Sequence, residues 1–169
     1  MERVARFEKV SRAVFVRDLA KYFPSLTEKE LESAYDRIAL PGRATSGSAG
    51  YDFRTPAGFA LTPGSSVTVP TGIRVRMRED HVLLLFPRSG LGFRYRLQLN
   101  NTVGVIDSDY YYAENEGHIL IKRTNDSREE KTVTLTAGDA FAQGVFLTYG
   151  ITEDDAAGGV RTGGFGSTG

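Results

Sequence analysis

Residues 65–87 read SSVTVPTGIRVRMREDHVLLLFP, and this stretch decides the fold class of the chain. Two short runs rich in β-branched residues are separated by Pro70 and Gly72, and a continuous apolar run, HVLLLFP, follows them. Runs of the same kind recur further along as GHILIKRTN, KTVTLTAGD and AFAQGVFLTYG. Short strands bounded by Gly, Pro, Asn or Asp are typical of sandwiches, jelly rolls and small barrels. We therefore expect an all-β domain in which HVLLLFP is buried on both faces.

The first forty residues have a different pattern. Apolar residues spaced among charges predict a short strand over 3–10. Residues 11–40 then carry apolar residues at helical spacing, interrupted at Pro24. After this proline, Thr27 and Glu30 form the sequence signature of a capping box, which begins a helix. We expect a small two-helix insert over 11–40, ahead of the all-β body.

Composition limits the classes of function. The 169 residues predict one domain over 1–169, and a formal net charge of +0 gives no overall attraction to nucleic acid or to an anionic membrane. The absence of Cys excludes disulfides, thiolate metal sites and cysteine nucleophiles. No stretch approaches the roughly 20 apolar residues that span a bilayer, so we expect a cytoplasmic protein. Residues 153–169 are rich in Gly and lack periodicity, which predicts a flexible C-terminal arm.

Two polar clusters precede and follow the long apolar run. ATSGSAGYDF ends close to Asp52, a carboxylate presented by a tight loop, which suits either a metal-linked water or a hydrogen-bonded turn. PRSGLGF places Arg88 and Ser89 beside Gly90. The backbone N–H groups of a Gly turn can bind an anion, and an arginine and a hydroxyl suit phosphate oxygens. An ordinary Ser-Gly turn is the alternative.

Two more polar clusters interrupt the later strands. In NNTVGVIDSDYYY, over 100–112, a hairpin could present its backbone edge to a flat base and a carboxylate to a water. Gln143 lies within a strand in AGDAFAQGVF and could equally be an ordinary strand side chain. No P-loop or EF-hand loop is present. His81 and His118 are far apart in sequence, and we expect both to be surface or strand residues.

Five short motifs occur in a fixed order: GSAGYD, PRSGLG, NTVGVIDSDY, GDAFAQ and GGFGSTG. Together they resemble motifs one to five of the deoxyuridine triphosphatase (dUTPase) family, over residues 41–169. The resemblance implies a jelly-roll β-barrel and a homotrimer with three active sites at subunit junctions. It also implies that the arm of one subunit closes a neighbouring site. The implied reaction is Mg²⁺-dependent hydrolysis of dUTP to dUMP and pyrophosphate.

The resemblance also implies roles for individual residues. Asp107 matches the carboxylate that deprotonates the attacking water, and Asp52 matches one that acts on the waters of the metal. Asn101 and the backbone at Gly104 would read the uracil edge, while Tyr110 would pack on the deoxyribose. The residues that match contacts to the phosphate chain or lie in the closing arm beside them are Arg88, Ser89, Gly90, Gln143, Arg161, Gly166, Ser167 and Thr168. Phe165 would stack on the uracil.

Three features depart from the pattern of the family. Arg161 stands four residues before Phe165, one fewer than in many members, and the segment 111–117 is longer than usual. The helical insert 11–40 is extra. It is either a packing addition at the periphery of the trimer or a surface for a protein partner. The alternatives to a dUTPase are a dCTP deaminase of the same fold and a phage-type regulatory protein that uses the fold to bind a partner.

Overall fold

A computed structural model describes residues 2–159 and 163 of the chain. Its β-strands are β1 (Ala5–Lys9), β2 (Gly42–Arg43), β3 (Tyr51–Arg54), β4 (Phe59–Leu61), β5 (Ser66–Pro70), β6 (Ile73–Met77), β7 (His81–Pro87), β8 (Leu97–Leu99), β9 (Gly104–Ile106), β10 (Leu120–Asn125), β11 (Val133–Leu135) and β12 (Ala140–Thr148). The helices are α1 (Arg12–Tyr22), α2 (Glu28–Asp36), α3 (Ser89–Tyr95) and the short 3₁₀ helix η1 (Ser108–Tyr112). Most of the regular structure is therefore β, as the sequence predicts.

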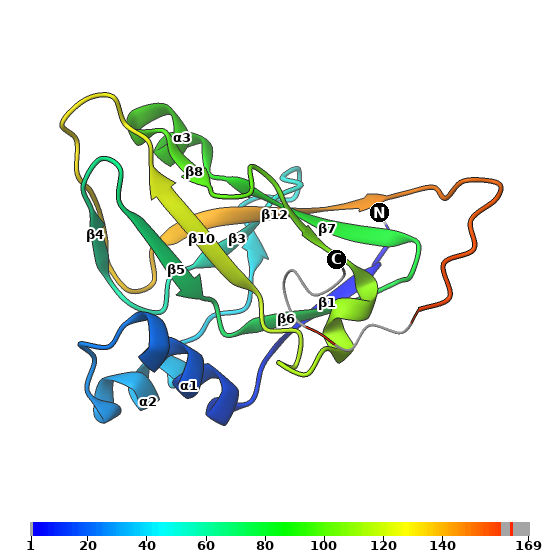
Figure 1. Ribbon diagram of the computed structural model, residues 1–169, viewed down its shortest axis with the longest axis horizontal. Helices are drawn as coiled ribbons and strands as arrows, with labels where there is room; N and C mark the ends of the chain where they lie inside the picture. The colour runs from blue at the N-terminus through cyan, green and yellow to red at the C-terminus, as the bar shows by residue number, and fades with distance from the viewer. Residues whose placement is uncertain (1, 160–162, 164–169) are drawn as a thin grey trace.

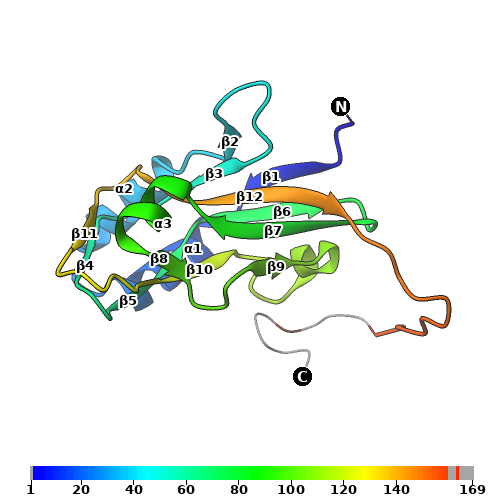
Figure 2. The same ribbon diagram turned by 90° about the horizontal axis from the view of Figure 1, so that it is seen from above.

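All pairings between these strands are antiparallel, and they join the strands into four small sheets. The largest has the order β2-β3-β12-β7-β9, and the others are β5-β10-β8, β1-β6 and β11-β4. Figures 1 and 2 show these sheets packed around a common interior. The architecture is a jelly-roll-like all-β fold, and the ladders of the described residues do not close into a barrel.

The strand β7 has one face fully buried and one face partly open. Its side chains alternate between buried positions, such as Leu83 and Leu85, and half-buried ones, such as Val82 and Leu84. The prediction that HVLLLFP is buried on both faces is therefore wrong for the second face. A continuous apolar run cannot distinguish a strand inside two layers from one whose outer face lines a cavity.

The helices of the insert pack into the main core of the protein. Figure 1 shows α1 and α2 at one end of the sheets, where α1 packs against β5 and α2 packs against α1. Phe15 and Leu19 of α1 are fully buried in the same hydrophobic cluster as residues of β3 and β7. The capping box predicted at the start of α2 is confirmed, because Thr27 accepts from Glu30 N–H and the Glu30 carboxylate accepts from Thr27 N–H. The insert thus supplies part of the core rather than lying outside it.

The histidines are only partly as predicted. His81 begins β7 and is therefore a strand residue. Its Nδ1 is hydrogen-bonded to Oδ1 of Asp80 at 2.7 Å. His118 is fully buried in the connection between η1 and β10, and the prediction of a surface or strand position is wrong for it. Its ring lies against α1, where Asp18 provides the partner. Only the tertiary fold brings these two residues together.

Within residues 2–159, no helix combines the length and the apolar character needed to cross a membrane.

We predict that Phe15→Ala lowers the free energy of unfolding by about 3–5 kcal/mol, because truncating a buried phenylalanine removes apolar contacts and leaves a cavity. Denaturant unfolding, followed by far-UV circular dichroism, would measure the change in the free energy of unfolding. Lys21→Ala, at an exposed position of the same helix, is the control and should change stability little. If the two variants unfold alike, the insert does not belong to the core.

Candidate active site

The strand register of the largest sheet gathers three of the predicted polar clusters. Asp52 of β3 lies opposite Gln143 of β12, and Gln143 lies opposite Phe86 of β7. Arg88 follows the end of β7, and its Nε lies 3.1 Å from Oδ1 of Asp52. Gln143 donates from Nε2 to the carbonyl oxygen of Pro87 at 3.0 Å. We call Asp52, Arg88, Ser89 and Gln143 the Arg88 cluster.

The stretch PRSGLGF forms the start of a helix and not the Gly turn that we expected. Arg88 is the N-cap of α3, and Ser89 and Gly90 lie in its first turn. Leu91 and Tyr95, one helical turn apart, pack on a small apolar cluster. This contact favours a helix over an isolated turn, and a Ser-Gly pair is compatible with both. The first turn still presents backbone N–H groups that lack partners within the helix.

Two open cavities flank the Arg88 cluster. One, of about 480 Å³, is lined by Phe86, Pro87, Arg88, Ser89, Gly92, Phe93 and Gln143. The other, of about 590 Å³, shares Arg88 and Ser89 with the first and also includes Gly90 and Arg94. Two arginines and a hydroxyl beside open space suit an anionic group. Phe93 is 92% exposed at the rim, so this side of α3 is apolar as well.

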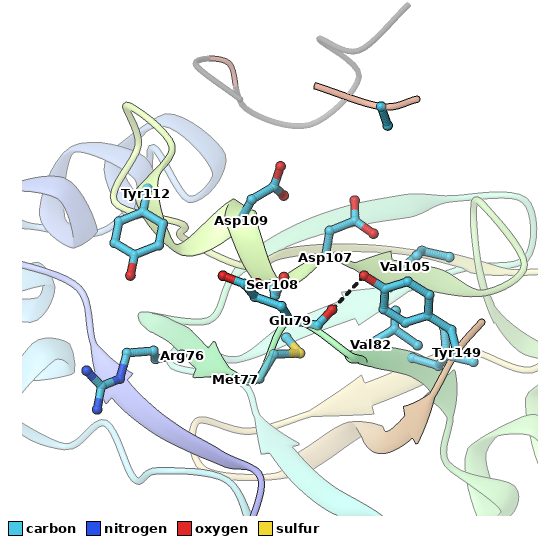
Figure 3. A pocket seen from close by; sticks show the side chains of 12 residues that line it. Arg76, Met77, Glu79, Val82, Val105, Asp107, Ser108, Asp109, Tyr112 and Tyr149 are labelled. Carbon is cyan, nitrogen blue, oxygen red and sulfur yellow. Dashed lines mark hydrogen bonds between the residues drawn. The ribbon is translucent and has the colours of Figure 1, made fainter. Parts of the chain in front are cut away.

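Asp107 lies in a separate and larger cavity, which we call the Asp107 cleft. It encloses about 840 Å³ and is lined by Arg76, Met77, Glu79, Val82, Leu84, Val105, Asp107, Ser108, Asp109, Tyr112, Tyr149 and Ala157. Figure 3 shows Asp107 and Asp109 projecting on one side of the cleft, above the strands that form its floor. The Tyr149 hydroxyl donates to the carbonyl oxygen of Glu79 at 2.6 Å at one end. A carboxylate at the rim of such a cleft can reach a bound water.

Local backbone structure places Asp107. It directly follows β9 and is the N-cap residue of η1. β9 pairs with β7, and a Cβ at Gly104 would lie 3.0 Å from the Cβ of Leu85, so a larger residue would press the strands apart. The absence of a side chain at Gly104 leaves its backbone close to the strand below. The contact between the Gly104 backbone and a ligand stays a prediction.

The chain around Asn101 reverses direction but does not form a hairpin. The turn is closed by Thr102 N–H, which donates to the carbonyl oxygen of Leu99 at 3.0 Å. The preceding strand, β8, pairs with β10, whereas the following strand, β9, pairs with β7. The predicted hairpin is therefore wrong, because the two strands belong to different sheets. Asn101 itself is exposed on the turn.

Tyr110 is held from inside the protein. It is only 2% exposed, and its hydroxyl donates to the carbonyl oxygen of His118 at 2.9 Å. Asn115 donates to the same hydroxyl from Nδ2 at 2.8 Å. The longer segment 111–117 thus folds back onto the tyrosine that precedes it. The contact between Tyr110 and a deoxyribose stays a prediction.

The Asp107 cleft and the Arg88 cluster lie far apart in one chain. Leu83 of β7 pairs with Ile106, so Asp107 is next to Val82, whereas Arg88 follows the other end of the same strand. Arg88 follows Val82 by six positions, which corresponds to roughly 20 Å at about 3.3 Å per residue. Figure 2 shows α3 and β9 separated accordingly. The two groups therefore lie near opposite ends of β7.

The remaining predicted site residues lie outside the described part of the chain. They are Arg161, Phe165, Gly166, Ser167 and Thr168. Among the described residues, no three or more His, Asp or Glu side chains form a group that could hold a metal ion by themselves.

Comparisons with known proteins agree with this architecture. A family model described as dUTPase matches residues 36–169. The deoxyuridine 5'-triphosphate nucleotidohydrolase of Lactococcus lactis subsp. lactis (strain IL1403) is 39% identical over 135 residues, which cover 78% of this chain and 89% of the relative. The crystal structure of a dUTPase from Streptococcus mutans has a TM-score of 0.63 and 34% identity, and covers 87% of this chain and 98% of its own.

The dUTPase of Staphylococcus bacteriophage 80alpha, solved with dUPNHPP, has the same fold at 20% identity. Its TM-score is 0.63, and the match covers 99% of both chains.

The fold places this chain among the jelly-roll-like all-β proteins. Within that class, this chain belongs to the dUTPase family.

We predict that Gly117→Ala distorts the site around Tyr110. Gly117 has φ +68°, and a Cβ there would lie 2.7 Å from the Tyr110 carbonyl oxygen and 2.8 Å from the Tyr111 Cα, which are backbone atoms that cannot easily move. Gly138→Ala is the matched control, since Gly138 also has a positive φ, +93°, but open space around it. Thermal unfolding should show a larger loss for Gly117→Ala, and equal losses would contradict the close packing.

Proposed function

We propose that this chain hydrolyses dUTP to dUMP and pyrophosphate, with Asp107 taking a proton from the water that attacks the α-phosphorus. The observation that carries the proposal is the position of Asp107, at the rim of a cleft of about 840 Å³ in a chain of the dUTPase family. The oxygen of the water forms a bond to phosphorus while the bond to the pyrophosphate oxygen breaks. Such an enzyme would limit uracil in DNA and supply dUMP for thymidylate synthesis, and we propose a cytoplasmic location for it.

Selectivity for dUTP would come from groups that must find partners. Cytosine presents an amino donor where uracil has a carbonyl acceptor, so polar groups of Asn101 and of the Gly104 backbone would be left unpaired. Tyr110 would lie against the deoxyribose and exclude a ribose hydroxyl. Phe165, in the C-terminal arm 153–169, would cover the uracil.

Magnesium fits the donors of the described residues. Mg²⁺ keeps several waters and is held by one or two carboxylates together with substrate phosphates, which agrees with scattered carboxylates and no closed cage. When bound, the ion would neutralise negative charge on the triphosphate. Asp52, whose side chain is 18% exposed and beside Arg88, would act on the waters of the ion. Arg88, Ser89, Gly90 and Gln143 would bind phosphate oxygens directly.

We further propose that the working enzyme is a homotrimer with shared sites. The separation of roughly 20 Å between Asp107 and Arg88 along β7 supports this arrangement, since a second copy is needed to bring an Arg88 cluster to each Asp107 cleft. The exposed Phe93 beside the Arg88 cluster is an apolar surface that such an assembly would cover. The arm 153–169 would close the site of a neighbour.

We predict that Asp107→Asn binds dUTP but turns it over about 10²–10⁴-fold more slowly, because an amide cannot accept the proton of the water. Pyrophosphate release measures turnover, and calorimetry with a non-hydrolysable analogue measures binding. The wild-type protein is assayed with dUTP, dTTP, dCTP and UTP, with and without Mg²⁺. Release of ammonia from dCTP would identify a deaminase instead, and normal turnover by the variant would exclude Asp107 as the base.

We predict that mixing two inactive variants restores activity. Asp107→Asn and Arg88→Ala each damage one half of the proposed site. When they are refolded together, some sites receive an intact Asp107 from one subunit and an intact Arg88 from another. For random mixing, about a quarter of the sites of a closed trimer would be complete. Activity no higher than the sum of the separate variants would place both groups of one site on the same chain.

A further inference from the structure

The helical insert is hydrogen-bonded to the segment that follows Asp107 and Tyr110 in the chain. Near the start of the insert, Ser11 donates its backbone N–H to Oε2 of Glu116 at 2.7 Å. In the middle of α1, Oδ2 of Asp18 lies 2.7 Å from Nδ1 of His118. Both contacts end on residues 116–118, and both come from the insert. The two departures from the family pattern, the insert and the longer segment 111–117, are therefore joined to each other.

The contact between Asp18 and His118 is directional. His118 accepts at Nε2 from the backbone N–H of Gly72 at 2.9 Å, so its other nitrogen, Nδ1, carries the proton that is donated to Asp18. His118 is fully buried and Asp18 is only 8% exposed. Burial raises the pKa of the Asp18 carboxyl, but hydrogen bonds from His118 and Arg17 outweigh burial and hold this pKa below its ordinary value. The Asp18 carboxylate therefore holds the His118 imidazole in place by a hydrogen bond.

His118 in turn is hydrogen-bonded to Tyr110. The Tyr110 hydroxyl donates to the carbonyl oxygen of His118, the same residue whose ring is fixed by Asp18 and Gly72. Asn115 donates to this hydroxyl from the neighbouring turn. A chain of hydrogen bonds therefore runs from α1, through His118, to the phenol of Tyr110.

We infer that Asp18 and Glu116 are positioning residues, through which the helical insert sets the place of Tyr110 and so the selection of deoxyribose over ribose. The inference rests on the proposed hydrolysis of dUTP. Its physical reason is that a residue that excludes one hydroxyl group must be held within a fraction of an ångström, and a displacement of about 1 Å can change a rate about 10²-fold. The hydrogen bonds from His118 to Asp18 and from Tyr110 to the His118 carbonyl oxygen connect the insert to Tyr110, and we expect the insert to act on selectivity through them.

The experiment compares kcat/KM for dUTP with kcat/KM for UTP. Asp18→Ala removes the acceptor of the His118 proton, and we expect the ratio of the two constants to fall at least about 10-fold as UTP is admitted. Asp18→Asn keeps an oxygen acceptor and should retain most of the ratio. Glu116→Ala and Glu116→Gln form a second pair at the outer contact, where only the alanine variant removes the acceptor of Ser11 N–H.

Leu31→Ala is the control for stability. Leu31 is a buried residue of α2 in the same insert, with no hydrogen bond to His118 or Tyr110 among the described contacts. Its truncation should lower thermal stability by an amount similar to Asp18→Ala and leave the ratio unchanged. All variants are assayed at a temperature at which thermal melts show them folded.

The outcomes separate the two proposals. A wild-type protein that does not hydrolyse dUTP overturns the proposed function. A wild-type protein that prefers dUTP, with a folded Asp18→Ala that prefers it equally, overturns only the positioning role. An equal change of ratio in Leu31→Ala overturns it as well, since general loosening would then suffice. If Asp18→Ala does not fold, Glu116→Ala decides, and a ratio equal to that of Glu116→Gln overturns the inference.

Discussion

The rest of the candidate site depends on one contact, the packing of the Leu85 side chain between two glycines. Gly144 of β12 and Gly104 of β9 both stand opposite Leu85 in the register of β7. A Cβ at Gly104 would lie 3.0 Å from Leu85, and one at Gly144 would lie 2.8 Å from Leu83. A slip of one residue would turn these leucines to the other face of the sheet, so the glycines and leucines define a single register. That register sets the positions of Asp107 and Gln143 together.

The insert is joined both to the core and to the segment that follows Tyr110. Its apolar residues, with Phe15 and Leu19 at the centre, belong to the main core, and its polar residues reach segment 111–118. An element that only covered the surface would make few buried polar contacts. The buried pair of Asp18 and His118 is costly unless both partners are present, because each would otherwise be a buried polar group without a hydrogen bond. The pair therefore links the folding of the insert to the geometry around Tyr110.

The sequence allows the strands and helices to be predicted more fully than the contacts between them. Alternating apolar runs and the capping box at Thr27 are local patterns, and the corresponding elements are present. The helix at Ser89 was missed because its apolar residues pack on a distant cluster, which no local pattern reveals. The pairing of β8 with β10, and not with β9, is likewise a property of the whole fold. Arg123 is a further example, since its alternation in β10 turns a guanidinium into the interior, where burial lowers its pKa to about 10.

The candidate site residues divide in the same way. The ordered motifs identify Asp52, Arg88, Asp107 and Gln143 as candidate site residues. Only the strand register shows which of these residues are neighbours in space. Neither the ion pair of Arg88 with Asp52 nor the separation of Arg88 from Asp107 follows from spacing along the chain. His118 carried no signal, because a single histidine without a nearby carboxylate in sequence resembles any other histidine. A glycine two residues after Asn115, at the end of a long polar segment, was the only local sign that the segment folds back.

On the proposed mechanism, the two halves of the site differ in how they are held. The phosphate-binding half depends on the end of β7 and the start of α3, and it must meet its counterpart across a boundary between copies of the chain. The half that recognises the sugar and holds the water is built within one chain, from β9, η1 and the network of His118. Substitutions that disturb the contacts between copies would therefore weaken binding of the triphosphate. Substitutions that disturb contacts within one chain would instead change the selectivity for deoxyribose over ribose. On this proposal, selectivity and assembly would depend on different contacts, because Asp107 and Arg88 lie near opposite ends of β7.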